Sequence, residues 1–320
     1  MSEKLSEEEI ETYREVGKLT SEVREEACEM IEPGEKLLTV AERVEEAIRE
    51  KGAKPAFPCN ISINEKAAHY SPPEEDETEF EKDDLVKLDI GAHIDGYIAD
   101  TATTVHVGEE DEVEPEKSEE TEKKEEPDKR REMVQAINLV LERAIDTVEP
   151  GINVGDIGKV IEDTAKEQGY NPVSNLTGHT LKPWSLHGGV SIPNVEKDTD
   201  EELEEGDVVA LEPFITDGEG EVEEMPEVYI FRVMKEGGVS GRMAQQTLRK
   251  IKSNYGNLPF AERWLTRDLS RIRLQVTLRD LLSSNVLRPY YVLKEVEDGL
   301  VAQAEHTMIV TEDGCEVTTR

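Results

Sequence analysis

The chain repeats one pattern of helices, turns and strands. Residues 5–31 and 36–51 carry apolar side chains at helical spacing and are separated by Glu32-Pro33-Gly34. Residues 129–148 and 153–168 do the same around Glu149-Pro150-Gly151, at an offset of 117. The same offset also matches further glycine, proline and apolar residues, namely Gly52, Pro55, Val23, Ile31, Val40 and Val44 with Gly169, Pro172, Val140, Val148, Ile157 and Ile161. The sequence therefore predicts a duplicated helix–turn–helix–strand unit.

The repeat continues into acidic strands. At an offset of 123, "DDLVKLDI" lies over "GDVVALEP", which matches Asp89 with Glu212. "ADTA" is similar to "AEHT", so Asp100 corresponds to Glu305, and His69 lies opposite His187 at an offset of 118. A pseudo-two-fold axis would bring four carboxylates to one centre. Such a centre is costly without a cation, because like charges repel strongly away from water.

Residues 88–102, "LDIGAHIDGYIADTA", predict a hairpin. Asp95-Gly96 suits a two-residue type I′ turn, which pairs Asp89 with Ala102 and Gly91 with Asp100. The two aspartates then lie diagonally on one face, roughly 7 Å apart at their Cβ atoms. The other face holds apolar or aromatic residues, namely Leu88, Ile90, Ala92, Tyr97 and Ala99. The hairpin alone does not decide between a cation site and a solvated acidic face.

Five residues form the predicted metal centre: Asp89, Asp100, His179, Glu212 and Glu305. One imidazole and four carboxylates suit Mn²⁺, Fe²⁺, Co²⁺ or Zn²⁺ and exclude a thiolate-rich structural zinc site. Two ions roughly 3.5–4 Å apart would use all four carboxylates, and a water bridging them would ionise near pH 7. Taken singly, His179 suits a structural role and Glu305 a solvated one. Strand alternation, however, places Glu305 on the side of Val301 and Thr307, which argues against exposure.

Charge and cysteine content restrict the cell compartment and the partners. The chain has 74 acidic and 37 basic residues, a net charge of −37, which disfavours DNA and anionic membranes as partners. A high-salt cytoplasm would screen such charge, although lysines are not scarce. Three scattered cysteines, the absence of a membrane-length apolar run and an N-terminus without a signal-peptide pattern predict a cytoplasmic protein.

Two segments fall outside the repeat. Residues 108–128 hold twelve acids and three lysines, which predicts a disordered acidic loop. Residues 240–290 hold ten basic and three acidic residues with helical patterning around Trp264, which predicts an inserted helical subdomain. Its cations could dock on nucleic acid or pair with acidic neighbours, and we favour the second. We therefore expect a catalytic domain from residues 1–235 and 291–320, with residues 236–290 inserted.

These motifs together resemble the methionine aminopeptidases of type II, the archaeal and eukaryotic form, over nearly the whole chain. The matching segments are "PAFPCNISINEKAAHYSP", "LDIGAHIDGYIADTA", "NLTGHTLKPWSLHGGVSIPN", "VALEPF" and "QAEHT". The insert, with "YGNLPFAERWL", is similar to the subdomain that separates type II from type I enzymes. The resemblance implies an α+β pita-bread fold with pseudo-two-fold halves and a winged-helix-like insert. It also implies that the five residues above bind metal.

The resemblance further implies a reaction. A hydroxide bridging two metal ions would attack the carbonyl after the N-terminal methionine of a nascent polypeptide, and Glu212 would pass a proton to the leaving amine. His69 and His187, neutral near pH 7, would donate hydrogen bonds to that carbonyl. Phe57 and Tyr290 would line the methionine pocket, with Leu186 a weaker candidate, although ordinary core packing explains all three as well. The family is monomeric and accepts small penultimate residues.

Two alternatives remain open at this level. Another pita-bread peptidase, for instance a proline-specific one, would share the metal ligands, although "AAHYSP" and the insert favour the methionine enzyme. A non-catalytic relative that binds RNA or protein would lose ligands, whereas this chain keeps all five. The basic insert leaves association with ribosomes open.

Overall fold

The computed structural model describes residues 4–108, 128–266 and 269–320 of the 320-residue chain. The expected disordered loop at 108–128 lies outside these residues except for its two ends. In the described part, no helix is long and apolar enough to cross a membrane.

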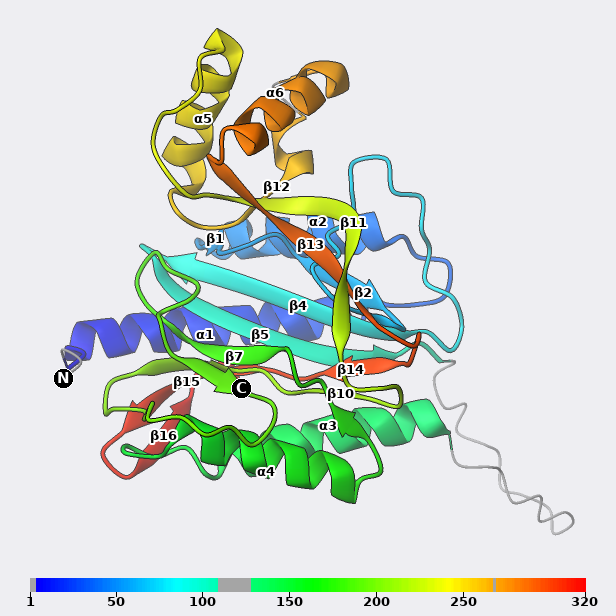
Figure 1. The fold of residues 1–320 in the computed structure, drawn as a ribbon, viewed down its shortest axis with the longest axis vertical. Helices are drawn as coiled ribbons and strands as arrows, with labels where there is room; N and C mark the ends of the chain where they lie inside the picture. The colour runs from blue at the N-terminus through cyan, green and yellow to red at the C-terminus, as the bar shows by residue number, and fades with distance from the viewer. Residues whose placement is uncertain (1–3, 109–127, 267–268) are drawn as a thin grey trace, which may run out of the picture.

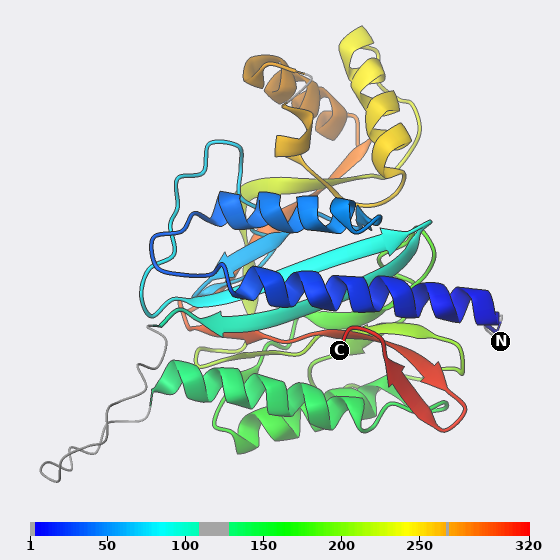
Figure 2. The same cartoon turned by 180° about the vertical axis from the view of Figure 1, so that it is seen from behind.

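The first half places two helices on one face of an antiparallel sheet (Figures 1 and 2). Helix α1 spans Glu7–Cys28 and α2 spans Leu37–Glu50, close to the expected ranges. A capping box between Ser6 and Glu9 starts α1. The sheet has the order β1-β4-β2 with β5 beside β4, and its strands are Lys54–Pro55 (β1), Asn60–Ile63 (β2), Leu85–Ile94 (β4) and Tyr97–His106 (β5).

The second half repeats this arrangement. Helices α3 (Lys129–Ile145) and α4 (Val154–Glu167) pack on each other and on a five-stranded sheet. That sheet has the order β16-β15-β9-β7-β8, with strands Gly314–Val317 (β16), His306–Thr311 (β15), Val208–Leu211 (β9), Thr177–Leu181 (β7) and Ser191–Pro193 (β8). A smaller sheet adds Val301–Gln303 (β14), Phe214–Thr216 (β10) and Asn171–Pro172 (β6).

The predicted duplication is visible in equivalent hydrogen bonds. Gly34 N–H donates to Phe80 O at 2.9 Å, and Gly151 N–H donates to Leu203 O at 2.7 Å. The two glycines have φ of 89° and 87°, a conformation that L side chains rarely adopt. These pairs obey the sequence offsets of 117 and 123, so the two halves share the same turn as well as the same elements.

The insert projects from one end of the molecule, where α5 and α6 stand apart from the sheets (Figure 1). Helices α5 (Arg242–Tyr255) and α6 (Arg271–Ser283), with the short β12 (Phe260–Ala261) and the 3-10 turn Glu262–Leu265, pack around their own apolar core. Two long antiparallel strands, β11 (Val222–Val233) and β13 (Leu287–Glu295), join it to β3 (Lys66–Ala68). The predicted domain limit at residue 290 falls within β13, so the exact division of the chain stays a prediction.

Basic residues of the insert pair with acidic neighbours. Arg263 forms a buried ion pair with Glu45 of α2, and Arg271 forms an exposed one with Glu75. Both pairs join the insert to the first half of the chain. These contacts agree with the favoured explanation of the insert's positive charge.

Candidate metal centre

The hairpin of β4 and β5 positions the first two acidic residues. Its register pairs Asp89 with Ala102 and Gly91 with Asp100, as the Asp95-Gly96 turn predicted. The opposite face of β4 carries Leu88 and Ile90 into the core beneath the first two helices. The carboxylates are therefore held on the face that turns away from α1 and α2, because side chains alternate along a strand.

The two halves of the chain meet at Ala102 and Glu305. Glu305 N–H donates to Ala102 O at 2.9 Å, and Ala102 N–H donates to Glu305 O at 3.3 Å. Glu305 is 1% exposed, which agrees with its expected burial. This antiparallel bridge places the acidic residue of the second half beside Asp100 of the first.

The remaining candidates come from the second half. A ligand atom of each of Asp100, His179 and Glu305 lies within 4.8 Å of the others, and His179 Nε2 is 3.9 Å from Asp100 Oδ2. Glu212 follows β9, and its Oε1 accepts a 2.7 Å hydrogen bond from Gln303 Nε2. Asp89 and Glu212 line a cavity of about 360 Å³ together with Asp100 and His179. The five predicted residues thus converge on one place.

Burial shifts the pKa values of the five candidate ligands. It raises the pKa of Asp89 to about 7, although the hydrogen bond from Asn60 acts in the opposite direction. Burial, followed by repulsion from neighbouring carboxylates, raises the pKa of Asp100, Glu212 and Glu305 well above the usual range. The His179 pKa falls to about 3, because burial and His187 disfavour the cation. In the absence of a cation, the carboxyl groups of the cluster therefore favour their protonated form, and the imidazole of His179 favours its neutral form.

Several buried atoms of the cluster lack a hydrogen-bond partner, namely Asp89 Oδ1, Asp100 Oδ1, His179 Nδ1, Glu305 Oε1 and Glu305 Oε2. Unpaired buried oxygens are unfavourable, and native structures contain few of them. Carboxylate oxygens and a neutral imidazole nitrogen are the ligands that a divalent transition metal accepts. Because metal binding requires deprotonated ligands, it would also remove the protons that burial favours. The residues present therefore fit a metal site.

Two further histidines line the cavity. His69 Nδ1 lies 3.0 Å from Tyr291 O, and its ring meets that of Tyr290 edge-on at 5.3 Å. The carbonyl only accepts, so Nδ1 carries the proton and Nε2 of the neutral ring is an acceptor. Burial and Arg288 lower the pKa of His69, which disfavours the cation. The expectation that neutral His69 donates to a substrate carbonyl does not fit this contact.

His187 extends from the loop between β7 and β8, and its ring lies 4.6 Å from that of His179. Among the described residues, no hydrogen bond to its imidazole nitrogens fixes the tautomer, in contrast to His69. Both histidines matched by the duplication therefore reach the same cavity, but only His69 has its neutral tautomer fixed by the backbone.

The expected methionine-pocket residues also line the cavity: Phe57, Leu186 and Tyr290. Phe57 packs directly over Gly91, between the two aspartates in sequence. A Cβ on Gly91 would lie 2.1 Å from Phe57 Cε1, so only glycine leaves room for this ring. The cavity thus combines an apolar wall with the carboxylate cluster.

Sequence reasoning missed two residues that orient the acids. Gln303 holds Glu212, and Asn60, the register partner of Asp89, donates to Asp89 Oδ2 at 3.3 Å. Gln303 stands two positions before Glu305, a spacing at which strand side chains share a face, so this signal was present. Asn60 had no such signal, because its partner strand is distant in sequence.

The model of metallopeptidase family M24 matches residues 11–312. The chain belongs to metallopeptidase family M24. The M24 chain is 47% identical to the methionine aminopeptidase of Methanothermobacter thermautotrophicus, over 97% of this chain and 98% of the relative. It is 44% identical to that of Methanocaldococcus jannaschii, over 98% and 100%. The crystal structure of the methionine aminopeptidase from Thermotoga maritima aligns with a TM-score of 0.69 and 25% identity over 100% of both chains.

Membership of M24 and the similarity to these relatives confirm the predicted fold and enzyme class. The fold is the pita-bread fold, and the chain is an enzyme, a metallopeptidase grouped with the methionine aminopeptidases of archaeal type. The relatives do not favour the proline-specific or the non-catalytic alternative.

Proposed function

We propose that the protein removes the N-terminal methionine from polypeptides in the cavity described above. The observation that carries this proposal is the convergence of one imidazole and four carboxyl groups with unpaired buried atoms. Asp89, Asp100, His179, Glu212 and Glu305 would hold divalent ions. Such ions supply a Lewis acid and a nucleophile that is available at neutral pH.

Two ions explain the donor set better than one, since four carboxylates exceed the charge of a single divalent cation. Mn²⁺, Fe²⁺, Co²⁺ and Zn²⁺ all suit one imidazole and four carboxylates. Elemental analysis of freshly purified protein would decide: two equivalents of a divalent metal support the pair, and a single equivalent contradicts it.

Glu212 is suited to moving a proton. Gln303 holds its Oε1, so Oε2 can hold a proton and pass it to the leaving amine. In the metal-free cluster, burial and repulsion from Asp89 and Asp100 raise the pKa of Glu212, and bound cations would lower it again. The amide of Gln303 would keep the carboxyl group oriented while the proton moves.

The two histidines would take different roles. With Nδ1 protonated, His69 presents Nε2 as an acceptor for a substrate N–H group. His187 would donate to the substrate carbonyl oxygen, where negative charge develops. This division assigns one histidine to each side of the peptide bond that is cleaved.

An apolar wall would select the methionine side chain. Phe57, Leu186 and Tyr290 would contact it, and Ile230 and Pro259 line the same cavity. A penultimate residue would lie next to the crowded acids, so we expect only small ones to be accepted. We also propose that the protein acts as a cytoplasmic monomer on nascent chains. Binding of the insert to ribosomes stays a prediction, which co-sedimentation would test.

The decisive experiment compares Met-Ala-Ser with an Ala-Pro peptide, each with and without a chelator. Methionine release that the chelator abolishes and added metal restores is expected. Cleavage of the Ala-Pro peptide alone would favour the proline-specific alternative, and no turnover with several metals would contradict catalysis. His69→Ala should keep its metal and lose most of the rate. Loss of the metal in that variant would show that His69 acts on the metal site.

A further inference from the structure

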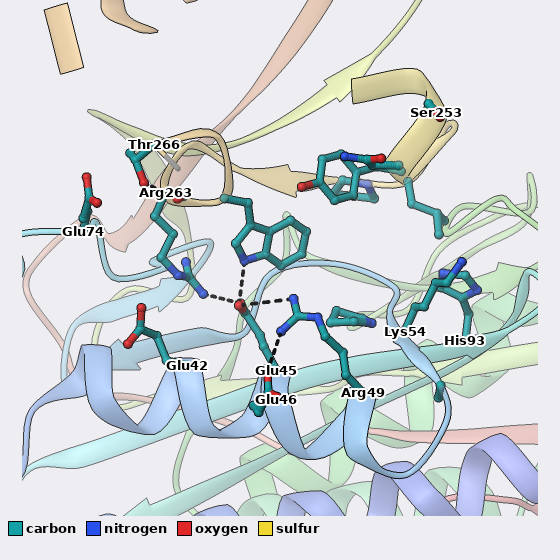
Figure 3. A pocket seen from close by; sticks show the side chains of 17 residues that line it. Glu42, Glu45, Glu46, Arg49, Lys54, Glu74, His93, Ser253, Arg263 and Thr266 are labelled. Atoms are coloured by element: carbon teal, nitrogen blue, oxygen red, sulfur yellow. Dashed lines mark hydrogen bonds and ion pairs between the residues drawn. The ribbon is translucent and has the colours of Figure 1, made fainter. Parts of the chain in front are cut away.

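A second, larger cleft lies between α2 and the insert, with a volume of about 810 Å³ (Figure 3). Its walls include Tyr255 and Trp264 of the insert, whose rings lie 5.2 Å apart. Lys54 of β1 and His93 of β4 line one end of it (Figure 3). None of these side chains has a part in the metal centre.

The cleft adjoins the catalytic cavity. Pro259 of the insert lines both spaces, so the two meet at this residue. His93 lies on the same face of β4 as Asp89, because the two are four positions apart on a strand. Strand β1 forms the edge of its sheet, and the cleft extends around this edge from the face that carries Asp89 to α2. A chain leaving the catalytic cavity past Pro259 would enter this cleft.

The far end of the cleft is acidic. Glu42 of α2 and Glu74 of the loop after β3 are exposed at the end opposite Lys54 and His93, and Glu46 is exposed one turn along α2 from Glu42 (Figure 3). Arg49 lies 3.8 Å from Glu46 and over the Trp264 ring at 6.0 Å. Three exposed carboxylates disfavour a polyanion and attract a cationic group, because the interaction is Coulombic.

The aromatic wall is held in place from below. Glu45 accepts a 2.6 Å hydrogen bond from Trp264 Nε1 and pairs with Arg263. Arg263 in turn donates to Ser71 Oγ at 2.5 Å, two residues beyond His69. Figure 3 shows Glu45 pointing up from α2 toward these groups. The cleft is therefore preformed and rigidly connected to the segment that carries His69, which lowers the cost of ordering a ligand.

We infer that this cleft binds the polypeptide substrate downstream of the penultimate residue. The substrate's backbone and apolar side chains contact Tyr255 and Trp264, and a lysine or arginine several positions from the cleaved bond faces Glu42, Glu46 and Glu74. An extended chain advances roughly 3.3–3.6 Å per residue, so a nonapeptide reaches roughly 20 Å further than a tripeptide, and we expect only the longer chain to reach these carboxylates. This inference rests on the proposed function, because it concerns the same substrate.

The test uses three peptides at low ionic strength: Met-Ala-Ser, a nonapeptide with this start and lysines at its last four positions, and a matched nonapeptide with glutamates there. The wild-type enzyme should cleave the lysine peptide with a kcat/KM on the order of fivefold above that of the glutamate peptide, since exposed ion pairs are individually weak. The double variant Glu42→Lys/Glu46→Lys should reverse this preference and leave Met-Ala-Ser unchanged.

A matched control separates the cleft from the general negative field. Glu25→Lys/Glu29→Lys makes the same charge change at exposed positions four apart on and just after α1, away from the cleft. It should keep the wild-type preference. The proposal would be wrong if the wild type cleaved both nonapeptides with equal kcat/KM. It would also be wrong if the control variant changed the peptide preference as much as Glu42→Lys/Glu46→Lys does. Failure to cleave any of the three peptides would instead contradict the proposed function and remove the basis of the cleft with it.

Discussion

The Thr307 side chain makes two hydrogen bonds to the backbone of Asp100. Thr307 Oγ1 accepts from Asp100 N–H and donates to Asp100 O, each at 2.8 Å. Thr307 and Asp100 come from different halves of the chain, on either side of their junction. The hydroxyl therefore replaces a backbone partner where the two strands separate, and it sets the position of a candidate metal ligand.

Replacing Thr307 with valine should weaken metal binding by about 10- to 100-fold, the usual effect of losing a group that orients a ligand. Both backbone groups of Asp100 would lose this partner, which also lowers the free energy of unfolding by about 1–3 kcal/mol. Calorimetric titration of the metal-free protein measures the first effect, and urea denaturation the second. Thr307→Ser should restore binding, because serine keeps the hydroxyl. Thr103→Val, on the same hairpin, is the control; equal losses there would contradict the role.

Asp89→Asn should abolish metal binding and activity yet stabilise the metal-free protein. A neutral amide cannot balance cations, but it also removes a buried carboxyl group that raises the pKa of Glu212 and Asp100. The melting temperature of the chelated variant should exceed that of the chelated wild type, while added metal should stabilise the wild type alone. Glu305→Gln should behave in the same way. A variant that keeps full activity would contradict the site.

His93 should make the protein sensitive to acid. Burial, with Lys54 nearby, lowers its pKa from 6.5 to about 4, and its Nδ1 accepts from Gly96 N–H. The unfolded chain binds the proton at the higher pH, so stability is lost as pH falls from about 6.5 to about 4. Protonation of His93 should lower the free energy of unfolding by about 2–3 kcal/mol over this pH range. His93→Asn should flatten the dependence of unfolding free energy on pH in this window. Parallel curves for variant and wild type would contradict it.

Salt should stabilise the whole protein. The many acidic residues that give the net charge of −37 repel one another, and at 0.1 M salt added ions screen the repulsion between exposed charges more than about 10 Å apart. We expect the melting temperature to rise as KCl is added from low to molar concentration. A flat response would remove the high-salt interpretation of the acidic surface. The chelated and metal-loaded forms should respond alike, because the acidic cluster of the site is buried.

Local sequence patterns were enough to predict much of the fold. The periodicity over 129–148 and 153–168 anticipated α3 and α4 to within a few residues, and Asp95-Gly96 specified the register of β4 and β5. Both signals act over short stretches of chain, where backbone conformation and the side-chain period decide the outcome. Helix ends were less exact, because the last apolar residues of each pattern lie in the following turn.

Contacts between distant segments were harder to foresee. Asn60 reaches Asp89 only because β2 pairs with β4, and Pro259 joins two cavities only because the insert folds back over β1. His69 was expected to donate to a substrate carbonyl, yet its Nδ1–H donates to Tyr291 O. No local spacing encodes such contacts, since they depend on how separate sheets are placed.

The order of the residues was enough to predict the duplication, the hairpin and the five candidate metal ligands. The duplication can be detected because matching residues recur at a fixed offset, and each half folds around its own helices and turns. The folded arrangement was needed to show that Asp100 and Glu305 lie side by side, that Asp100 Oδ1 and both Glu305 carboxyl oxygens are buried without a partner among the described residues, and that a cleft opens toward the insert. These properties arise from packing the two halves together, where desolvation and mutual repulsion first act on the carboxyl groups.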